Sequence, residues 1–430
     1  MVVALNREYG VEKPHLTFGY RQLVKVFVLY WVLVFTLRFL LNTLFQSELY
    51  FSAVTLFSIL FLLFCSFPKL NLYFFKLCLI DQVLLVLGFV FCGYGIIIFD
   101  YIFFQTSFII FIVPILLFLL VLGRDVRKIV VRGYLFLGIM VSLEIIFEFI
   151  FFNHYFLGLG EDFLTTYDYL EYRSLFSHNE SYADDRAVGG ILRVDGLFGY
   201  NHTTGAFLAV LAAFFFEYVK YAARYRIFYA LYFFLFLLGV FASTSTTAIL
   251  ALALSLFFSV FLDVGVKRLT KGGLFFFVVV FFVAFYFSSL GGFLFDRLNQ
   301  NLESTSYVSA FIPAFQDFSH FLRYLAGFNS AHSFIAESDL FRIISNFGII
   351  VVFILFYRVS RLYLCVFRSN CYANGVLIYR ASGSAVLAGF LVLIHTSATL
   401  GWNVGSAVFL FYSLLMVHFY QNRVGNGADV

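Results

Sequence analysis

The sequence predicts an all-α, polytopic membrane protein. Of its 430 residues, 62% are hydrophobic and only 12% are charged, and the apolar residues are gathered in long runs. A soluble globular chain carries about 25% charged residues, so this chain lacks the charge needed to cover a water-exposed surface of its size. These observations exclude a cytosolic enzyme, a nucleic-acid binder and a disordered scaffold.

The apolar runs predict about twelve transmembrane helices, because about 20 apolar residues are needed to cross the hydrocarbon core. The runs are continuously apolar rather than alternating, which excludes a membrane barrel. No cleavage site follows the first run, so we expect it to be a retained span. The predicted spans are 24–41, 49–67, 77–99, 101–122, 130–152, 203–219, 226–242, 246–263, 273–290, 338–357, 376–395 and 403–419.

The basic residues orient these spans. When the N-terminus is placed in the cytoplasm, most of the 28 lysines and arginines fall in cytoplasmic segments, as the positive-inside rule requires. Both termini are then cytoplasmic. The basic residues that break the rule are all arginine, and they are Arg38, Arg173, Arg186, Arg193, Arg297, Arg323 and Arg342.

The chain is expected to form one integral membrane domain, residues 1–430, with two long extracytoplasmic loops at 153–202 and 291–337. The other predicted connections are short, and long loops within a compact fold are usually functional. The five cysteines show no metal-ligand spacing, and none lies in either long loop. We therefore expect neither a metal site nor a disulfide framework.

Arginine is the only basic residue type in the two long loops. Its planar guanidinium binds phosphate or carboxylate through two hydrogen bonds and stays charged. Ion pairing with a nearby acid, such as Asp195 or Glu337, is the alternative for any single arginine. For the loop arginines together, the favoured interpretation is that at least two bind an anionic ligand.

The first loop ends in a glycine-rich segment that leads directly into a span. Arg193 is followed by Gly196 and Gly199, which permit a tight backbone path, and then by Asn201 and Thr203, either of which is placed to cap the next helix. A helix N-terminus preceded by an arginine is a natural phosphate site. A capped helix after a glycine turn is the simpler alternative, and it accounts for Asn201 but not for Arg193.

Two further external features carry hydroxyl or titratable groups. The run Ser243–Thr247 lies between two spans and either binds sugar hydroxyls or forms a tight turn that bonds to its own backbone. At the end of the second loop, His332, Glu337 and Asp339 are candidate general bases. Arg342 follows Asp339 by one helical turn, so the two side chains pair if that segment is helical.

Ionisable residues inside predicted spans are costly to bury and often functional. Glu144 and Glu148 lie one turn apart on one face of the span 130–152. They form a proton relay, line an acceptor cavity or approach the membrane surface. Asp81 and Glu217 lie near the cytoplasmic interface, where we expect them to snorkel towards water.

Three motifs follow one another along the chain. Arg193, Gly196, Phe198 and Asn201 precede one span, the Ser243–Thr247 run follows the next helix, and Gly327, His332 and the sequence Glu-Ser-Asp precede another span. Together they resemble the superfamily of O-antigen ligases and Wzy-type O-antigen polymerases, which are bacterial envelope glycosyltransferases. The resemblance covers residues 190–357 in motif and the whole chain in topology.

The resemblance implies a GT-C-like helical fold and a glycan donor linked to undecaprenyl diphosphate, with no metal, nucleotide or other cofactor. His332 matches the loop histidine of ligases, whereas Glu337 and Asp339 match an acidic motif of polymerases. The family often has an arginine in the Ser243–Thr247 turn, and this chain has none there. Arg323, Arg342 or Arg297 is expected to replace it in holding the diphosphate.

The candidate site that follows has two sets of residues. The expected catalytic residues are His332, Glu337 and Asp339. The residues expected to bind the diphosphate or the glycan are Arg193, Asn201, His202, Ser243, Ser245, Arg323 and Arg342.

The leading expectation is a polymerase of the bacterial inner membrane that transfers a growing lipid-linked glycan onto the next lipid-linked repeat unit of a surface polysaccharide or lipopolysaccharide. The first alternative is an O-antigen ligase, which transfers the finished glycan to lipid A core or to protein. The second is a polysaccharide or lipid transporter, which predicts repeated halves and broken helices. The expected partners are the bilayer, the lipid-linked donor and acceptor, and a regulator of chain length, with no nucleic acid.

Overall fold

The structure is a computed structural model, and it describes about half of the chain. The described residues are 79–112, 124–155, 201–222, 225–263, 346–368 and 377–395, with residues 22, 26, 327, 343 and 344 and parts of 157–198. Four predicted spans, 24–41 apart from Val26, 49–67, 273–290 and 403–419, lie outside these residues. So does the second long loop, 291–337, apart from Gly327.

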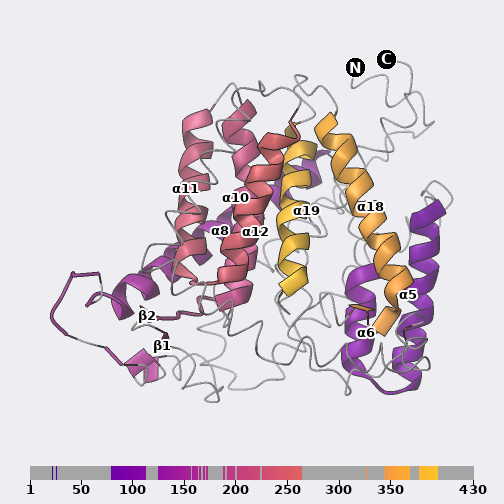
Figure 1. The fold of residues 1–430 in the computed structure, drawn as a ribbon, viewed down its shortest axis with the longest axis horizontal. Helices are drawn as coiled ribbons and strands as arrows, with labels where there is room; N and C mark the ends of the chain where they lie inside the picture. The colour runs from indigo at the N-terminus through magenta and orange to yellow at the C-terminus, as the bar shows by residue number, and fades with distance from the viewer. Residues whose placement is uncertain are drawn as a thin grey trace.

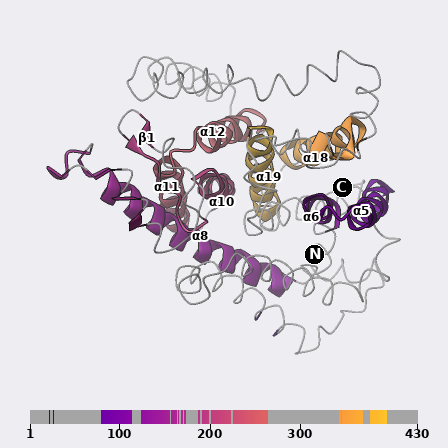
Figure 2. The same cartoon turned by 90° about the horizontal axis from the view of Figure 1, so that it is seen from below.

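The described residues are mainly helical, which confirms the predicted class for this part of the chain. The elements are α5 (Leu79–Ile97), α6 (Tyr101–Ser107), the π-helix η2 (Phe108–Ile112), α8 (Arg124–Phe152), β1 (Ala187–Val188), β2 (Ile191–Leu192), α10 (Asn201–Tyr221), α11 (Arg226–Ala242), α12 (Thr246–Phe261), α18 (Ile349–Arg368) and α19 (Leu377–His395). The strands form one antiparallel hairpin, in which Ala187 pairs with Leu192 and Val188 with Ile191. Figure 1 shows α10, α11, α12 and α19 running side by side, and Figure 2 shows α8 lying across this group.

Hydropathy located most helix limits well and one poorly. Helix α11 covers the predicted span 226–242. Helix α18 begins at Ile349 and ends at Arg368, whereas the predicted span was 338–357. Gly348 has a φ of 85°, which breaks the helix before Ile349. At its other end, α18 continues to Arg368, beyond the apolar run that ended the predicted span at 357. The helical hydrogen bonding of the backbone does not require apolar side chains.

The break before α18 is also where the second loop meets the helices. Gly327 has a φ of 81°, and a Cβ atom added to it would lie 2.5 Å from the carbonyl carbon of Phe347 and 2.7 Å from the nitrogen of Gly348. Only glycine fits so close an approach at a positive φ. Gly327, the glycine of the predicted His332 motif, therefore packs against the backbone just before α18.

Helix α10 is the centre of the described fold. It contacts α8, α11, α12 and α19, and Figure 2 shows it end-on among these helices. Its middle carries small residues that are fully or almost fully buried, including Ala206, Ala209, Ala212 and Ala213. Small side chains let neighbouring helix backbones come close, which is how helices associate when lipid surrounds them.

The outer surfaces of the described helices are apolar. Two helical segments, Val131–Phe152 and Asn201–Tyr221, are long and apolar enough to cross a membrane. One side of α11 exposes large apolar side chains and includes Ile227, Phe228, Leu231, Phe234, Leu238 and Phe241. A water-soluble monomer rarely exposes so continuous an apolar face. These features support membrane association.

The helices bring polar residues together at two opposite ends of α10. The last turn of α10, the end of α12 and the start of α19 meet at one end, where Lys220, Asp263 and Arg380 are in contact. The first turn of α10 meets the connection between α11 and α12 at the other end. This antiparallel arrangement agrees with the alternating directions predicted for spans 203–219, 226–242, 246–263 and 376–395.

Candidate functional site

Five of the predicted site residues are described by the structure: Arg193, Asn201, His202, Ser243 and Ser245. Arg193 lies in the segment that leads to α10. Asn201 and His202 form the first turn of α10, and His202 Nδ1 lies 3.2 Å from the hydroxyl of Ser245. Ser243 and Ser245 belong to the connection between α11 and α12. The structure therefore brings together two motifs that the sequence separates by about 40 residues.

The Ser243–Ser245 connection is a tight turn. The Ser243 hydroxyl donates to the carbonyl of Val240 at 2.6 Å, and the Ser245 hydroxyl caps α12 by accepting from the N–H of Ala248 at 3.4 Å. Thr244 between them has a φ of 52°, a value that non-glycine residues seldom adopt. The turn expected as the alternative to a sugar-binding run is thus present, and the bond to His202 links it to α10.

A glycine allows α10 to approach this turn. A Cβ atom added to Gly205 would lie 2.5 Å from the Ser243 hydroxyl oxygen and 2.9 Å from the Cβ atoms of Ser245 and Ala248. Contacts this short do not occur between real atoms, so any larger residue would push the two elements apart. The last glycine of the Arg193–Gly205 motif therefore serves helix packing.

The segment 192–198, which we name the Arg193 segment, is fixed on its N-terminal side by α8. Asn153 follows the last residue of α8, and its side chain binds the backbone of Leu192 twice. The Asn153 Oδ1 accepts from the Leu192 N–H at 2.7 Å, and the Nδ2 donates to the Leu192 carbonyl at 3.1 Å. Asn153 is 1% exposed, so these bonds are shielded from water and hold Leu192 firmly.

A buried carboxylate fixes the C-terminal side of the same segment. Glu148 Oε2 accepts from the N–H of Gly196 at 3.2 Å and from the hydroxyl of Tyr169 at 3.4 Å. The Tyr169 hydroxyl in turn accepts from the N–H of Asp195 at 2.7 Å, and Thr204 of α10 donates to the Asp195 carbonyl at 2.6 Å. Two successive N–H groups and a carbonyl are thus held by side chains.

The backbone conformation at Gly196 is part of this arrangement. Gly196 has a φ of 66°, and an added Cβ atom would lie 3.0 Å from Thr204 Cγ2 and 3.1 Å from Glu144 Oε2. Both glutamates of α8 therefore face the Arg193 segment. Glu148 is 1% exposed, so its carboxylate is enclosed by protein. The three predicted roles of the Glu144 and Glu148 pair stay predictions.

A local turn presents Tyr169 to this network. Thr165 and Asp168 form a capping box, in which Asp168 Oδ2 accepts from the Thr165 N–H at 2.5 Å and the Thr165 hydroxyl at 2.7 Å. The Asp168 N–H donates back to the Thr165 hydroxyl at 3.3 Å. The hydrogen bonds from Thr165, that of the hydroxyl first, hold the pKa of Asp168 below its usual range. The adjacent Tyr169 is fully buried.

Two hydrogen-bond donors at this end have no partner among the described residues. They are Nε of Arg193 and Nδ2 of Asn201, and both atoms are buried. The Asn201 Oδ1 is occupied, because it accepts from the His202 N–H at 2.9 Å. A buried donor without a partner costs free energy, and guanidinium and amide donors both suit an anionic oxygen. The capped-helix alternative leaves both donors unexplained.

The remaining predicted site residues lie outside the described residues. They are His332, Glu337, Asp339, Arg323 and Arg342. Within the described part of the chain, no group of three or more His, Cys, Asp or Glu side chains is placed to hold a metal ion.

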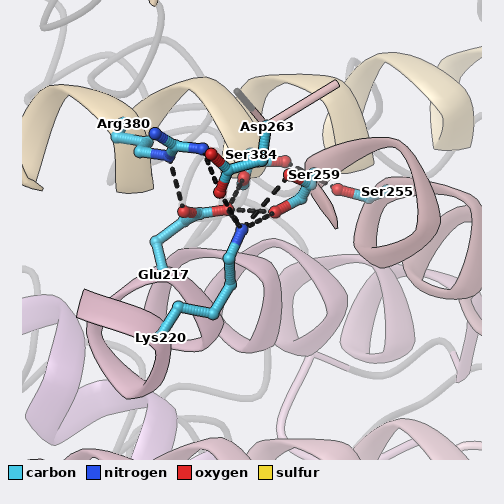
Figure 3. Close-up of polar contacts among 7 residues, drawn as sticks. All are labelled: Glu217, Lys220, Ser255, Ser259, Asp263, Arg380 and Ser384. Atoms are coloured by element: carbon cyan, nitrogen blue, oxygen red, sulfur yellow. Dashed lines mark hydrogen bonds and ion pairs between the residues drawn. The ribbon is translucent and has the colours of Figure 1, made fainter. Parts of the chain in front are cut away.

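The opposite end of α10 holds an ionic cluster, which we define as Glu217, Lys220, Asp263 and Arg380 (Figure 3). Arg380 Nε binds Glu217 Oε2 at 3.0 Å, and its Nη2 contacts Asp263 Oδ2. Lys220 Nζ lies 3.1 Å from Asp263 and 3.4 Å from Glu217. Two acids thus meet two bases, so the cluster has no formal net charge.

Serine side chains complete the ionic cluster. Glu217 Oε1 accepts hydrogen bonds from the hydroxyls of Ser259 and Ser384, the latter at 2.9 Å, and the Arg380 guanidinium lies 4.5 Å from the centre of the Tyr221 ring. Glu217 is fully buried. The expectation that Glu217 snorkels to water is therefore wrong: partners from α12 and α19 satisfy its carboxylate inside the protein.

The sequence did not reveal the residues whose side chains hold the backbone of the Arg193 segment. Asn153, Tyr169 and Thr204 bind backbone groups that lie 39, 26 and 9 residues away, and no local pattern marks such partners. The ionic cluster left a weak signal. Lys220, Asp263 and Arg380 each lie at or near the end of a predicted span on the same side of the membrane, and with Glu217 they make two acids and two bases.

Comparison with known proteins gives no relative for this chain: no family model, no curated protein and no solved structure matches it.

Proposed function

We propose that this chain is a membrane glycosyltransferase that uses a lipid-diphosphate-linked glycan as its donor, and that the N-terminal end of α10 binds the diphosphate. The observation that carries the proposal is the pair of buried donors, Arg193 Nε and Asn201 Nδ2, which lack partners among the described residues. They lie at or shortly before the start of a helix long and apolar enough to cross a membrane. An anionic group at the membrane surface suits both donors.

A lipid diphosphate meets the chemical requirements of this location. Its oxygens accept from arginine and amide donors, and its hydrocarbon tail reaches the site from the bilayer. A sugar nucleotide is made in the cytoplasm, so a glycosyl donor used at the outer face needs another activating group. The Arg193 segment belongs to a loop predicted to be extracytoplasmic, which favours a lipid-linked donor at the outer face of the bacterial inner membrane.

The proposed reaction is glycan polymerisation. A hydroxyl of the acceptor repeat unit attacks the anomeric carbon of the donor glycan, the bond to the diphosphate oxygen breaks, and the acceptor proton passes to a protein base. Arg193 and Asn201 neutralise and hydrogen-bond the leaving diphosphate, which favours the transition state. The base is expected among His332, Glu337 and Asp339, and a fixed backbone around Arg193 contributes orientation.

A deletion strain tests this proposal. Loss of a polymerase leaves single-repeat glycans on the carrier lipid and on the cell surface, and we expect this result. Accumulation of long lipid-linked chains would instead identify the ligase, which shares the donor but differs in its acceptor. An unchanged glycan profile would contradict both enzymes.

Complementation links the phenotype to the proposed site. The wild-type gene and the Ser142→Ala variant should both restore long chains, because Ser142 is a buried serine of α8 whose hydroxyl makes no hydrogen bond in the structure. Arg193→Ala should not restore them at an equal level of membrane protein. Full complementation by Arg193→Ala would contradict the role of this residue.

A further inference from the structure

We propose that Glu148, Asn153 and Tyr169 are positioning residues. Their hydrogen bonds to the backbone on both sides of Arg193 hold this residue in the position in which it binds the diphosphate. This inference rests on the proposed function, since it assumes that Arg193 binds the donor. None of the three residues has to touch the donor for it to hold.

Glu148 is a carboxylate buried in the membrane-spanning part of the protein. Glu148 lies in an apolar helix and is 1% exposed. A carboxylate in such a place is expensive and persists only with partners or a function. Its described partners are the N–H of Gly196 and the hydroxyl of Tyr169. The Glu148 carboxylate therefore holds the backbone of the Arg193 segment, directly at Gly196 and through Tyr169 at Asp195.

Side chains bind backbone groups on both sides of Arg193. Before Arg193, Asn153 binds both backbone polar groups of Leu192. After it, the Tyr169 hydroxyl binds the Asp195 N–H, and Glu148 binds the Gly196 N–H. The residues that hold the segment are themselves buried, so water does not compete for these bonds.

These hydrogen bonds hold the backbone around Arg193 and do not involve its guanidinium. Leu192 and Val194, the neighbours of Arg193, are buried, whereas Nε of Arg193 is buried and has no hydrogen-bond partner among the described residues. The protein thus fixes the chain on both sides of Arg193, while this donor of the guanidinium is bound to none of the described residues. Holding a binding group in its bound position lowers the ordering cost of binding, and this is the role that the geometry supports for all three residues.

The test measures binding of undecaprenyl diphosphate to the purified full chain in detergent, with undecaprenol as the ligand that lacks the diphosphate. Arg193→Ala should raise the Kd for undecaprenyl diphosphate at least tenfold, the loss expected for one charge-assisted hydrogen bond. Tyr169→Phe removes a single oxygen atom and should raise this Kd by about threefold to tenfold. The Kd for undecaprenol should not change in either variant.

A double-mutant cycle separates positioning from a merely structural role. If Tyr169 acts through Arg193, then Tyr169→Phe has no further effect on the Kd once Arg193→Ala is present. If it only stabilises the fold, its effect on the Kd is the same in both backgrounds, or is absent while the thermal unfolding midpoint falls. Either of these last results overturns the inference.

Conservative variants keep the test decisive where a substitution disturbs folding. Glu148→Gln retains an oxygen that accepts from the Gly196 N–H, so its Kd should lie closer to the wild-type value than that of Glu148→Ala. Ser142→Ala is the matched control on α8 and should bind as the wild type does. If Glu148→Ala does not fold, the Tyr169→Phe cycle alone decides the outcome.

The same measurements distinguish failure of the inference from failure of the proposed function. A wild-type protein that binds undecaprenyl diphosphate no better than undecaprenol contradicts the proposed function and the inference with it. A wild-type protein that does prefer the diphosphate, and loses the preference with Arg193→Ala but shows no coupling to Tyr169, contradicts the inference alone.

Discussion

The two ends of α10 use buried polar residues in opposite ways. At the C-terminal end, each side chain of the ionic cluster contacts one of opposite charge. At the N-terminal end, side chains grip the backbone of the Arg193 segment, while Nε of Arg193 and Nδ2 of Asn201 stay without partners in the described residues. Both ends are polar and largely buried. The charged side chains at the C-terminal end are paired with one another, whereas the guanidinium of Arg193 at the other end keeps an Nε without a hydrogen-bond partner among the described residues.

This difference shows how a buried charge in a membrane protein can be assigned a role. A charge whose partners are all protein groups contributes to the fold, because removing one partner leaves another buried and unpaired. A donor held in place without a partner is ready for something that binds from outside. The ionic cluster is therefore expected to control stability, and the Arg193 end is expected to control activity.

The largest predicted effect is on stability, at the ionic cluster. Arg380→Ala leaves Glu217 and Asp263 facing each other with only Lys220 to compensate them, and should cost about 3–5 kcal/mol of stability. The yield of monodisperse protein in detergent and its thermal unfolding midpoint should both fall. Arg226→Ala is the control, because Arg226 is exposed and its Nε donates to the carbonyl of Val219 at the surface, and it should cost less than about 1 kcal/mol.

A paired substitution sharpens this prediction. Replacing Glu217 and Arg380 together by leucine removes one acid and one base and keeps the Lys220–Asp263 pair. The double variant should be more stable than Arg380→Ala alone, because no unpaired charge remains buried. Equal or greater destabilisation would show that the cluster does not act through charge compensation.

The next effect is on activity, at Arg193. Arg193→Ala should lower donor-dependent glycan transfer about 100-fold or more, the loss typical of a removed charge-stabilising donor. The free energy of unfolding should change by no more than about 0.5 kcal/mol, as for an ordinary surface substitution. The reason is that Arg193 Nε makes no hydrogen bond that the substitution would break. A large loss of stability would move Arg193 into the same class as the ionic cluster.

A smaller effect is predicted for the packing between α10 and the Ser243–Ser245 turn. Gly205→Ala should cost about 1–3 kcal/mol, as overpacking does, since the added methyl group would meet the Ser243 hydroxyl at 2.5 Å. Gly93→Ala is the control in another helix, because nothing lies within 4 Å of its added Cβ atom. It should be neutral or stabilising by up to about 1 kcal/mol, and thermal unfolding of both variants measures the contrast.

The smallest effect tests the sign of the ligand charge at Asn201. Asn201→Ala should weaken binding of a diphosphate ligand by about tenfold, since it loses one donor. Asn201→Asp should weaken it further, because a carboxylate repels an anion at the same position. A stronger affinity for Asn201→Asp than for Asn201→Ala would contradict an anionic ligand at this end.

The fold was largely predictable where apolar runs coincide with helices. Helices α10, α11, α12 and α19 begin and end within a few residues of the predicted spans, because burial in lipid and helix formation demand the same residues. The prediction failed at α18, where the limit is set by the conformation of Gly348 and by backbone bonding rather than by hydropathy.

The candidate site was predictable only for residues whose own chemistry points to a ligand. Arg193 and Asn201 were found because arginine is the only base in the long loops and because asparagine favours helix starts. Glu217 was misread, since a single chain position cannot show that Arg380, far along the sequence, meets it at 3.0 Å. Tyr169 and Asn153 carry no local signature, and their role exists only in the folded arrangement.

The most direct test of the central claim is a chain-extension assay with the purified protein in a lipid bilayer. The substrate is the single-repeat lipid-linked glycan that accumulates in the deletion strain. The two quantities measured are the length of the glycan chains and the amount of undecaprenyl diphosphate released. The account predicts that the wild-type protein converts single repeats into a ladder of longer chains and that Arg193→Ala, equally folded, does not. No extension by the wild-type protein, or full extension by Arg193→Ala, would contradict it.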